Sequence, residues 1–304
     1  MDAVKCLAPT HDRCGEGALW IEHEQALYWC DVGRFLVHRY DLATQSVRSW
    51  SFDEPVVALA PTTDHSRLLV CLASRILLWR PAGDSSVDIG FSLPGYRKVR
   101  LNDGRADPAG YFWVGSMENN TLPSGDLDTA VEGHFQSPGL GVLYRVAMDG
   151  SSRVMRSGIG VSNTLCWSAD GRTFFFGDTL ANEIRAFDYD LETAEIGQSR
   201  SHFAGFNRGG PDGSAIDSEG CLWNCRFGGG CVVRVAPDGK IARIIEMPCA
   251  DITICAFGGA DMKTLFVLSA SMLGHAGERL AGSLFAIDVD VAGLPEHRVK
   301  TDAI

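Results

Sequence analysis

Short apolar runs separated by polar turns follow one another along the whole chain, and stretches with helical periodicity are scarce. In "PDGSAIDSEGCLW", which starts at Pro211, a brief apolar run leads into Ser-Glu-Gly, and a second run opens on Cys-Leu-Trp. Runs of this kind, bounded by Gly, Asp, Pro and Ser and rich in aromatic residues, are typical of β-strands. The pattern predicts an all-β fold.

The strand–turn–strand unit recurs along the sequence. Three copies align well: "LNDGRADPAGYFWVGSM" from Leu101, "SNTLCWSADGRTFFFGDT" from Ser162 and "PDGSAIDSEGCLWNCRF" from Pro211. Three looser copies start at Glu16, Val57 and Cys255, and several copies are followed by a third strand that ends in a turn. Six copies spaced by roughly 50 residues, with about four strands each, are typical of a six-bladed β-propeller. We therefore expect residues 1–304 to form a single propeller domain rather than a β-sandwich or two smaller β domains.

A polar side chain recurs at one place in this repeat. Eight residues before the turn glycine of the three good copies lie Asn102, Asn163 and Asp212. In the first copy the turn glycine is replaced, and the same place falls on Glu16. The other two copies have apolar residues there, near Val57 or Ala58 and near Ile254.

Equivalent positions on the innermost strands of a propeller form a ring around its channel. Two carboxylates and two amides in such a ring would repel or stay unsatisfied unless something binds them. One divalent metal ion would resolve both problems. Ca²⁺, Mg²⁺, Mn²⁺ or Fe²⁺ suit oxygen donors, and Zn²⁺ is tolerated. The alternative is that each residue is an ordinary turn cap, because Asn and Asp are common in turns.

Arg100 lies two residues before Asn102 in "KVRLND". Residues i and i+2 of a strand face the same side, so Arg100 should face the channel if Asn102 does. An arginine beside a cation site would suit the binding of polar substrate oxygens; a surface arginine is the alternative.

Composition and charge narrow the function classes. The chain has 304 residues, of which 45% are hydrophobic, and its formal net charge is −11. This balance argues against nucleic acid or an anionic membrane as a partner. The N-terminus lacks the pattern of a signal peptide and no apolar stretch approaches a membrane span, so we expect a soluble cytoplasmic protein, as a monomer or small homo-oligomer. The ten cysteines include no C-x-x-C pair, which favours buried strand thiols over a zinc or redox role.

Several motifs together resemble the gluconolactonase/regucalcin (senescence-marker-protein) family of sugar lactonases. They are "GEGALW", "RLNDGRADPAGYFWVGSM", "SNTLCWSADGRTFFFGDT", "FDYDLETA", "PDGSAIDSEGCLW" and "FGG" near Phe257. The resemblance covers nearly the whole chain in order. It implies a six-bladed propeller with one catalytic divalent metal and, as the substrate, a small sugar lactone of the aldonolactone class.

The resemblance also implies roles for individual residues. The family's metal ligands correspond to Glu16, Asn163 and Asp212, and its lactone-binding Arg and Asn correspond to Arg100 and Asn102. Some members place an acidic substrate contact in the region where this chain has Glu118 and Asn120.

The stretch from Glu118 to Gly139 looks longer than the matching loop of the family and is expected to overhang the channel mouth, which leaves the identity of the sugar open. His134 within this loop is expected to be solvent-exposed.

The chemistry expected from these residues is metal-dependent lactone hydrolysis to the aldonic acid. The metal would act as a Lewis acid or activate water, and Asp212 would serve as ligand and general base. No G-x-S-x-G elbow occurs in the sequence, and no Ser-His-Asp arrangement is needed. Three alternatives remain open: a promiscuous esterase of paraoxonase type, a non-catalytic Ca²⁺-binding regulatory propeller, and a scaffold propeller with a structural ion.

Overall fold

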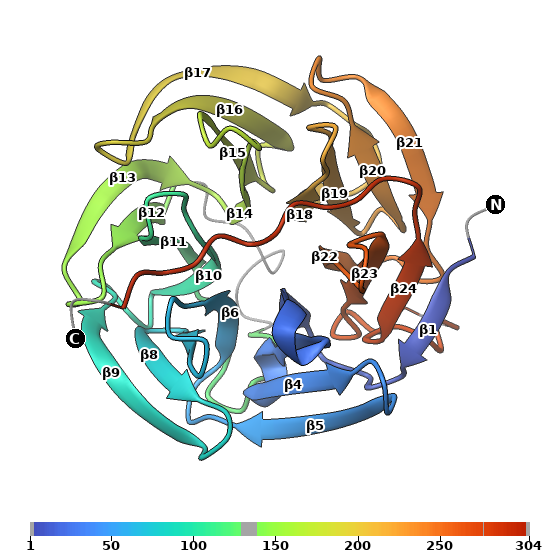
Figure 1. The fold of residues 1–304 in the computed structure, drawn as a ribbon, viewed down its shortest axis with the longest axis horizontal. Helices are drawn as coiled ribbons and strands as arrows, with labels where there is room; N and C mark the ends of the chain where they lie inside the picture. The colour runs from blue at the N-terminus through green and yellow to red at the C-terminus, as the bar shows by residue number, and fades with distance from the viewer. Residues whose placement is uncertain (1–2, 129–138, 276, 302–304) are drawn as a thin grey trace.

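Six antiparallel sheets of four strands each surround a central axis in the computed structural model, which describes residues 3–128, 139–275 and 277–301 (Figure 1). The first three sheets are β2 (Gly15–Ile21), β3 (Ala26–Asp31), β4 (Leu36–Asp41), β5 (Ser46–Ser51); β6 (Val56–Pro61), β7 (Leu68–Leu72), β8 (Arg75–Arg80), β9 (Ser85–Ser92); and β10 (Val99–Ala106), β11 (Phe112–Glu118), β12 (Gly141–Val146), β13 (Ser152–Ile159). The next two are β14 (Ser162–Trp167), β15 (Thr173–Asp178), β16 (Glu183–Asp190), β17 (Glu195–Ala204); and β18 (Gly210–Ile216), β19 (Leu222–Phe227), β20 (Cys231–Val235), β21 (Ile241–Glu246). Two 3₁₀ turns, η1 (Glu22–Glu24) and η2 (Val32–Arg34), flank β3. The predicted all-β six-bladed propeller is confirmed.

The sixth sheet joins the two ends of the chain. It consists of β22 (Ile252–Gly258), β23 (Thr264–Ser269), β24 (Leu284–Asp288) and the N-terminal strand β1 (Lys5–Ala8). β1 pairs antiparallel with β24 and forms the outer edge of the sheet, while β22 is innermost. The ring is therefore closed by main-chain hydrogen bonds between the first and last strands.

Burial falls from the axis outward. Every residue of β6 and β7 is buried, whereas most of the outer strand β13 is exposed. β6 and β7 are covered on both faces by neighbouring sheets, so they have continuous apolar runs rather than strict alternation. Trp113 and Trp223, at matching places in two repeats, are fully buried, and their indole Nε1 atoms donate to Asp107 (2.6 Å) and Asp217 (2.8 Å).

The turn glycines that aligned the repeats have the backbone conformation that requires glycine. Gly110, Gly171 and Gly220 have φ of 93°, 68° and 79°. In the first sheet Gln25 takes the left-handed conformation instead, with φ of 46°, one residue later than the count from Glu16 places the turn. A short 3₁₀ helix precedes it and lengthens this turn.

Each innermost strand has an irregular register near its start. The shifts lie between Glu16 and Leu19, Val56 and Ala58, Leu101 and Gly104, Asn163 and Cys166, Pro211 and Ser214, and Ile252 and Cys255. Such β-bulges bend a strand and re-aim its side chains. The four polar positions predicted from the repeat all lie at these bulges.

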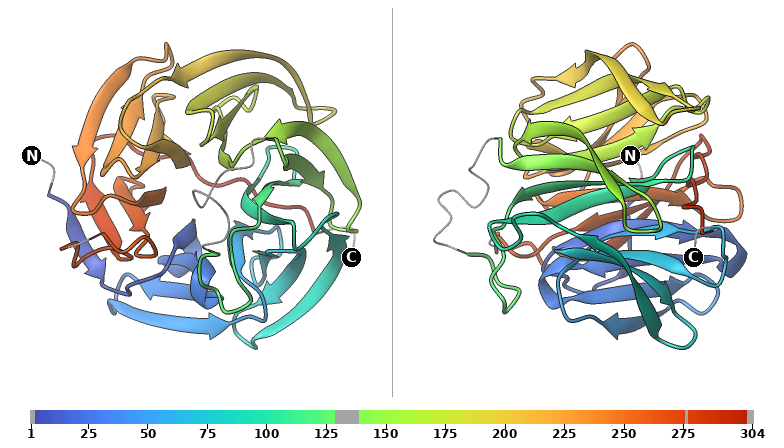
Figure 2. Two further views of the ribbon diagram at one scale, coloured as in Figure 1. Left: turned by 180° about the vertical axis from the view of Figure 1, so that it is seen from behind. Right: turned by 90° about the vertical axis from the view of Figure 1, so that its left-hand side faces the viewer.

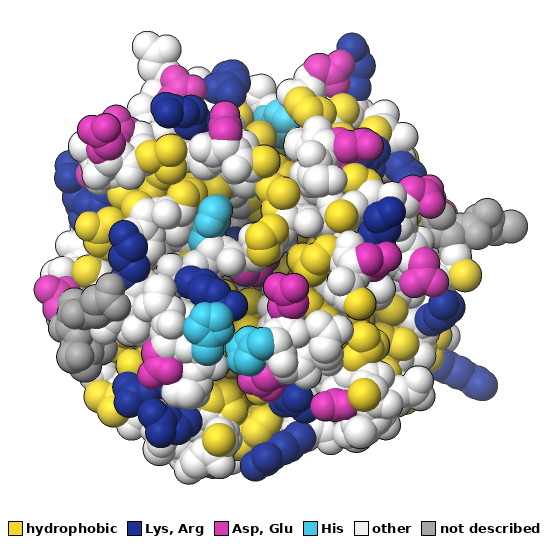
Figure 3. Space-filling view, viewed as in Figure 1, with side chains coloured by type: hydrophobic (Ala, Val, Ile, Leu, Met, Phe, Trp, Pro, Cys, Tyr) yellow, Lys and Arg dark blue, Asp and Glu magenta, His cyan; other side chains and the backbone are white. Residues whose placement is uncertain are grey.

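The two faces of the propeller are covered by different segments. Residues 291–301 cross the face seen in Figure 1, where the amides of Leu294, Val299 and Lys300 bond to carbonyl oxygens of three different sheets. Residues 120–128 lie at the opposite face (Figure 2). Basic and acidic side chains are interspersed over the face crossed by residues 291–301 (Figure 3).

The ten cysteines are all free thiols. Eight are buried, as predicted, but Cys6 is exposed and Cys14 is partly exposed. The described residues include no helix with the length and hydropathy of a membrane span.

Candidate active site

Three of the predicted site residues form a hydrogen-bonded chain across two sheets. Arg100 Nη1 on β10 donates to Asn102 Oδ1 at 2.7 Å, and Asn102 Nδ2 donates to Asn163 Oδ1 on β14 at 3.2 Å. Arg100 and Asn102 therefore face the same side, as strand alternation predicted. The bulge that follows Leu101 lets Asn102 reach the neighbouring strand.

The two acids of the ring have raised pKa values, and the charge of Asp212 acts on Glu16. Burial is the largest cause that raises the pKa of Glu16 well above its ordinary value, and the charge of Asp212 is the next. Burial likewise raises the pKa of Asp212 well above its ordinary value, followed by the charge of Asp103. Asp212 is 5% exposed, and its Oδ1 has no hydrogen-bond partner among the described residues. A buried carboxylate such as that of Asp212 needs a proton or a cation to be stable.

The backbone of Asp212 is fixed by buried polar side chains. Asn224 Nδ2 donates to the Asp212 carbonyl at 3.1 Å, and the hydroxyl of Thr164 donates to the same oxygen. The guanidinium of Arg226 donates to Asn224 Oδ1 at 3.2 Å, which leaves the Asn224 amide nitrogen facing Asp212. Asn224 and Arg226 thus hold the bulge that presents the carboxylate.

Asn163 is oriented from the other side. Its Nδ2 donates to Thr179 Oγ1 at 2.8 Å, and Thr179 donates in turn to the Pro211 carbonyl at 2.7 Å. Because Asn163 Nδ2 is bonded to Thr179, the amide oxygen of Asn163 faces Asn102 and the ring. Thr179 therefore connects the residue before Asp212 to the orientation of Asn163.

A cavity of about 270 Å³ opens beside this group. Its walls are formed by Arg13, Cys14, Val32, Gly33, Arg100, Asn120, Thr121, Gly125, Asp126, Leu127, Ser271 and Met272. Nε and Nη2 of Arg100 donate to Asn120 Oδ1 at 3.3 and 3.1 Å, and both residues are buried. Burial lowers the pKa of Arg100, and none of its hydrogen bonds within the described chain goes to a carboxylate.

The loop predicted to overhang the channel is described only in part. Glu118 is half-buried at the end of β11, opposite Val99, and is absent from the described residues that line the cavity. Asn120 and Thr121 do line it. His134 and the rest of 129–138 lie outside the described residues.

Sequence reasoning missed several residues that line the cavity or support Asp212. Cys14 was interpreted as a buried strand thiol, but it is a cavity wall residue, and the charges of Glu16 and Asp212 add to burial in raising its pKa. Strand alternation could have found it, because Cys14 lies two residues before Glu16. Arg13, whose Nη1 lies 3.1 Å from Asp126 Oδ1, and Asn224 carried no sequence signal.

Comparisons with known proteins extend over nearly the whole chain. A family model described as SMP-30/Gluconolactonase/LRE-like region matches residues 14–271. Regucalcin of Gallus gallus is 34% identical, with 97% of each chain covered, and 6-deoxy-6-sulfogluconolactonase of Pseudomonas putida is 32% identical, with 97% of this chain and 98% of the relative covered. The solved structure of a calcium-binding protein, regucalcin, from Agrobacterium tumefaciens is similar with a TM-score of 0.88 and 27% identity, covering 98% of this chain and 97% of that one.

Proposed function

Because this chain belongs to the SMP-30/gluconolactonase/LRE-like family, we propose that it is a metal-dependent hydrolase of sugar lactones. The resemblance found in its motifs is confirmed by the family match and by relatives above 30% identity. One observation supports the proposal most strongly. A buried carboxylate, Asp212, lies beside a second acid, with one oxygen unpartnered among the described residues, next to a cavity lined by Arg100 and Asn120.

The side chains of the ring fit a hard divalent cation. Glu16, Asn163 and Asp212 offer carboxylate and amide oxygens, the donors that Ca²⁺, Mg²⁺ and Mn²⁺ prefer. Glu16 is partly exposed, so the group remains open to solvent and substrate. When bound, such an ion would supply Lewis acidity toward the lactone oxygen and would lower the pKa of water.

The cavity suits a ligand of monosaccharide size. Its volume of about 270 Å³ lies just below the roughly 300–1,000 Å³ of typical small-molecule sites. Arg100 and Asn120 line the cavity and can orient sugar hydroxyls, and Asn102, which accepts a hydrogen bond from Arg100, is proposed as a third contact. The guanidinium of Arg100 has no carboxylate among its hydrogen-bond partners and can stabilise the negative charge that develops on the lactone oxygen.

Asp212 is the residue proposed to move the proton. Its unpartnered Oδ1 can accept a proton from the attacking water, a role that contributes typically about 10²–10⁴-fold in rate. Asn224 and Thr164 hold its backbone, so the carboxylate needs little reorganisation before the proton is transferred.

The test combines metal removal with one substitution. The chelator-treated protein should lose hydrolysis of a panel of aldonolactones, followed by acid release, and added divalent metal should restore it. Asp212→Asn should lower kcat by roughly 10²–10⁴-fold while the protein stays folded by circular dichroism. Asp238→Asn, an exposed acid in the β20–β21 turn of the same sheet, serves as the matched control and should keep full activity. Undiminished turnover by Asp212→Asn would refute the assignment.

A second candidate function is non-catalytic calcium binding, favoured by the similarity to a solved structure described as a calcium-binding regucalcin. It predicts stoichiometric Ca²⁺ binding without turnover of any lactone. Titrating Ca²⁺ while measuring lactone hydrolysis separates the two functions, and phenyl acetate in the same assay tests the broader esterase alternative.

A further inference from the structure

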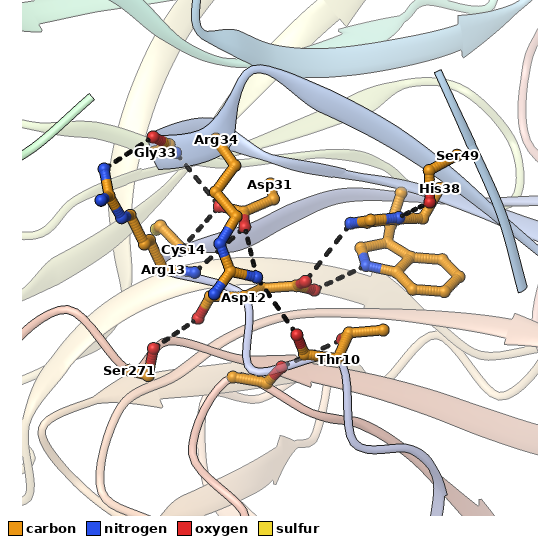
Figure 4. Close-up of polar contacts among 12 residues, drawn as sticks. Thr10, Asp12, Arg13, Cys14, Asp31, Gly33, Arg34, His38, Ser49 and Ser271 are labelled. Atoms are coloured by element: carbon orange, nitrogen blue, oxygen red, sulfur yellow. Dashed lines mark hydrogen bonds and ion pairs between the residues drawn. The ribbon is translucent and has the colours of Figure 1, made fainter. Parts of the chain in front are cut away.

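A second group of potential metal ligands lies in the first sheet, apart from the ring. Asp12 precedes β2, Asp31 ends β3 and His38 lies on β4 (Figure 4). Their exposed fractions are 0%, 0% and 5%. One ligand atom from each residue lies within 4.8 Å of the other two.

Two of these ligand atoms make no hydrogen bond to the described residues. Asp12 Oδ1 and His38 Nε2 lie 3.3 Å apart and point toward each other (Figure 4). Neither atom has a hydrogen-bond partner among the described residues, because the contact between them lacks hydrogen-bond geometry. The opposite ring nitrogen, His38 Nδ1, lies 2.6 Å from Ser49 Oγ. A donor hydrogen on Nδ1 would leave the lone pair of Nε2 directed at the two carboxylates.

The remaining oxygens of the acids hold them in position. Asp12 Oδ2 accepts a hydrogen bond from Trp29 Nε1 at 2.7 Å. The Asp31 carboxylate accepts from the backbone amides of Arg13, Cys14 and Gly33 at 3.2, 3.3 and 3.1 Å. Metal ligands in proteins are oriented by such outer hydrogen bonds.

The charge of the group is poorly balanced by its surroundings. Burial raises the pKa of Asp31, and the charge of Asp12 raises it further. The nearest cation to Asp31 is Arg34, whose Nη1 lies 3.6 Å from Oδ2 and whose side chain is 42% exposed. Arg34 also donates to the Thr10 carbonyl at 3.2 Å, so it lies over the group at the protein surface.

We propose that Asp12, Asp31 and His38 form a second cation site, which takes a transition-metal ion of the zinc type. One imidazole nitrogen and two carboxylate oxygens are a donor set that Zn²⁺ accepts, with water in a fourth position. The 3.3 Å between Asp12 Oδ1 and His38 Nε2 matches two ligands that each lie about 2.0–2.1 Å from a tetrahedral ion. Asp31 would have to move slightly for its carboxylate to become the third ligand. Displacement of the Arg34 side chain would let the ion reach the three ligands.

This site differs from the ring in chemistry and does not depend on the proposed lactonase activity. The ring offers oxygen donors, which suit hard ions, whereas this group adds an imidazole, which favours zinc, cobalt or nickel. The ring would therefore bind a hard ion such as Ca²⁺, and the second site would bind an ion of the zinc type.

The experiment uses the full chain with the ring disabled by Glu16→Gln and Asp212→Asn, so that ring-bound metal does not interfere. The chelator-treated protein is equilibrated with Zn²⁺, freed of excess metal by gel filtration and analysed for zinc by mass spectrometry. About one zinc ion per chain is expected. Adding His38→Gln or Asp12→Asn should weaken binding by roughly 10–100-fold or more. His202→Gln, a half-buried histidine on β17, is the matched control and should bind as before.

X-ray absorption at the zinc edge keeps the proposal testable even if these variants fail to fold. In the ring-disabled protein it should show nitrogen and oxygen neighbours, including one imidazole, and no sulfur. No zinc binding at micromolar metal, unchanged binding in both cluster variants, or a sulfur neighbour from Cys14 would overturn the proposal. In the first of these cases His38 and Asp12 form only a buried polar contact.

Discussion

Asp212 depends on side chains that never line the cavity. Asn224 is fully buried and donates to the Asp212 carbonyl and to the hydroxyls of Thr164 and Ser214, at 3.1, 3.3 and 3.0 Å, while its oxygen accepts from Arg226. Removing one partner of such a network leaves the others unsatisfied in a medium of low dielectric constant.

Asn224→Ala should therefore lower the free energy of unfolding by about 1–3 kcal/mol, measured by urea denaturation. Its activity should fall as well, because the bulge that presents Asp212 loses a tether. Asn207→Ala, at an exposed position, should change stability by no more than about 0.5 kcal/mol. Equal effects of the two substitutions would contradict the role given to Asn224.

The contrast between Asp212 and Asn224 shows what the sequence can predict about a site. Asp212 was predicted because it occupies a repeated position, and repetition places it on the channel axis. Asn224 occupies the middle of an ordinary strand. Its importance arises from Asp212 and Ser214 on the paired strand β18 and from Thr164 on β14 of the neighbouring sheet, contacts that no local pattern encodes.

At the level of elements, bulges and loops decide which residues meet. Alternation correctly placed Arg100 with Asn102, but the segment 120–128 follows no strand rule. Thr121 and Leu127 form an isolated bridge, and Gly125, with φ of 81°, packs so closely on Gly33 that a Cβ would lie 1.9 Å from its carbonyl oxygen. This arrangement depends on the distant 3₁₀ turn η2, which contains Gly33, and could not be predicted from the segment itself.

Arg13 ties this segment to the first sheet. Its Nη1 bonds to the carbonyls of Gly33 and Ser124 and lies 3.1 Å from Asp126 Oδ1. Since exposed ion pairs contribute roughly 0.2–1 kcal/mol, Arg13→Gln should raise KM for the lactone by no more than about fivefold and leave kcat nearly unchanged.

Steady-state kinetics measures this split between KM and kcat. Arg200→Gln removes an exposed ion pair with Asp188 on the outer strands and should alter neither constant. A large loss of kcat in Arg13→Gln would mean that Arg13 takes part in the chemistry.

For the whole molecule, the sequence repeat predicted the number of sheets. It did not predict that the N-terminal strand β1 pairs with β24 and closes the ring of sheets. "KCLA" is too short and too lightly patterned to be recognised as a strand, yet β1 completes the sixth sheet. Deleting residues 1–9 should expose the edge of β24, lower the melting temperature and promote aggregation, as followed by calorimetry and light scattering. A melting temperature equal to that of the full chain would show that closure contributes little.

Metal removal should make stability depend on pH in a definite direction. Glu16 and Asp212 have raised pKa values in the folded chain, so above the ordinary value of about 4 the folded state holds more protons than the unfolded state. The stability of the metal-free protein should therefore fall as pH rises through this window, from the ordinary value up to the raised one. A bound divalent ion favours the ionised acids and should offset the loss.

Melting temperatures with and without EDTA at pH 5 and pH 8 measure this effect. The gap between the two conditions should widen at the higher pH, and Glu16→Gln with Asp212→Asn should flatten it. A gap that narrows as pH rises would contradict the raised pKa values.

The C-terminal segment that crosses one face of the propeller bears on how substrate enters the cavity and product leaves it. Residues 291–301 cross one face of the propeller, whereas the cavity is lined by residues of the 120–128 segment at the opposite face, so we expect small molecules to enter from that side. A lactone substrate and its acid product would then enter and leave the cavity at the same face. In that arrangement the acid product has to leave before the next lactone binds, so slow product release would limit kcat.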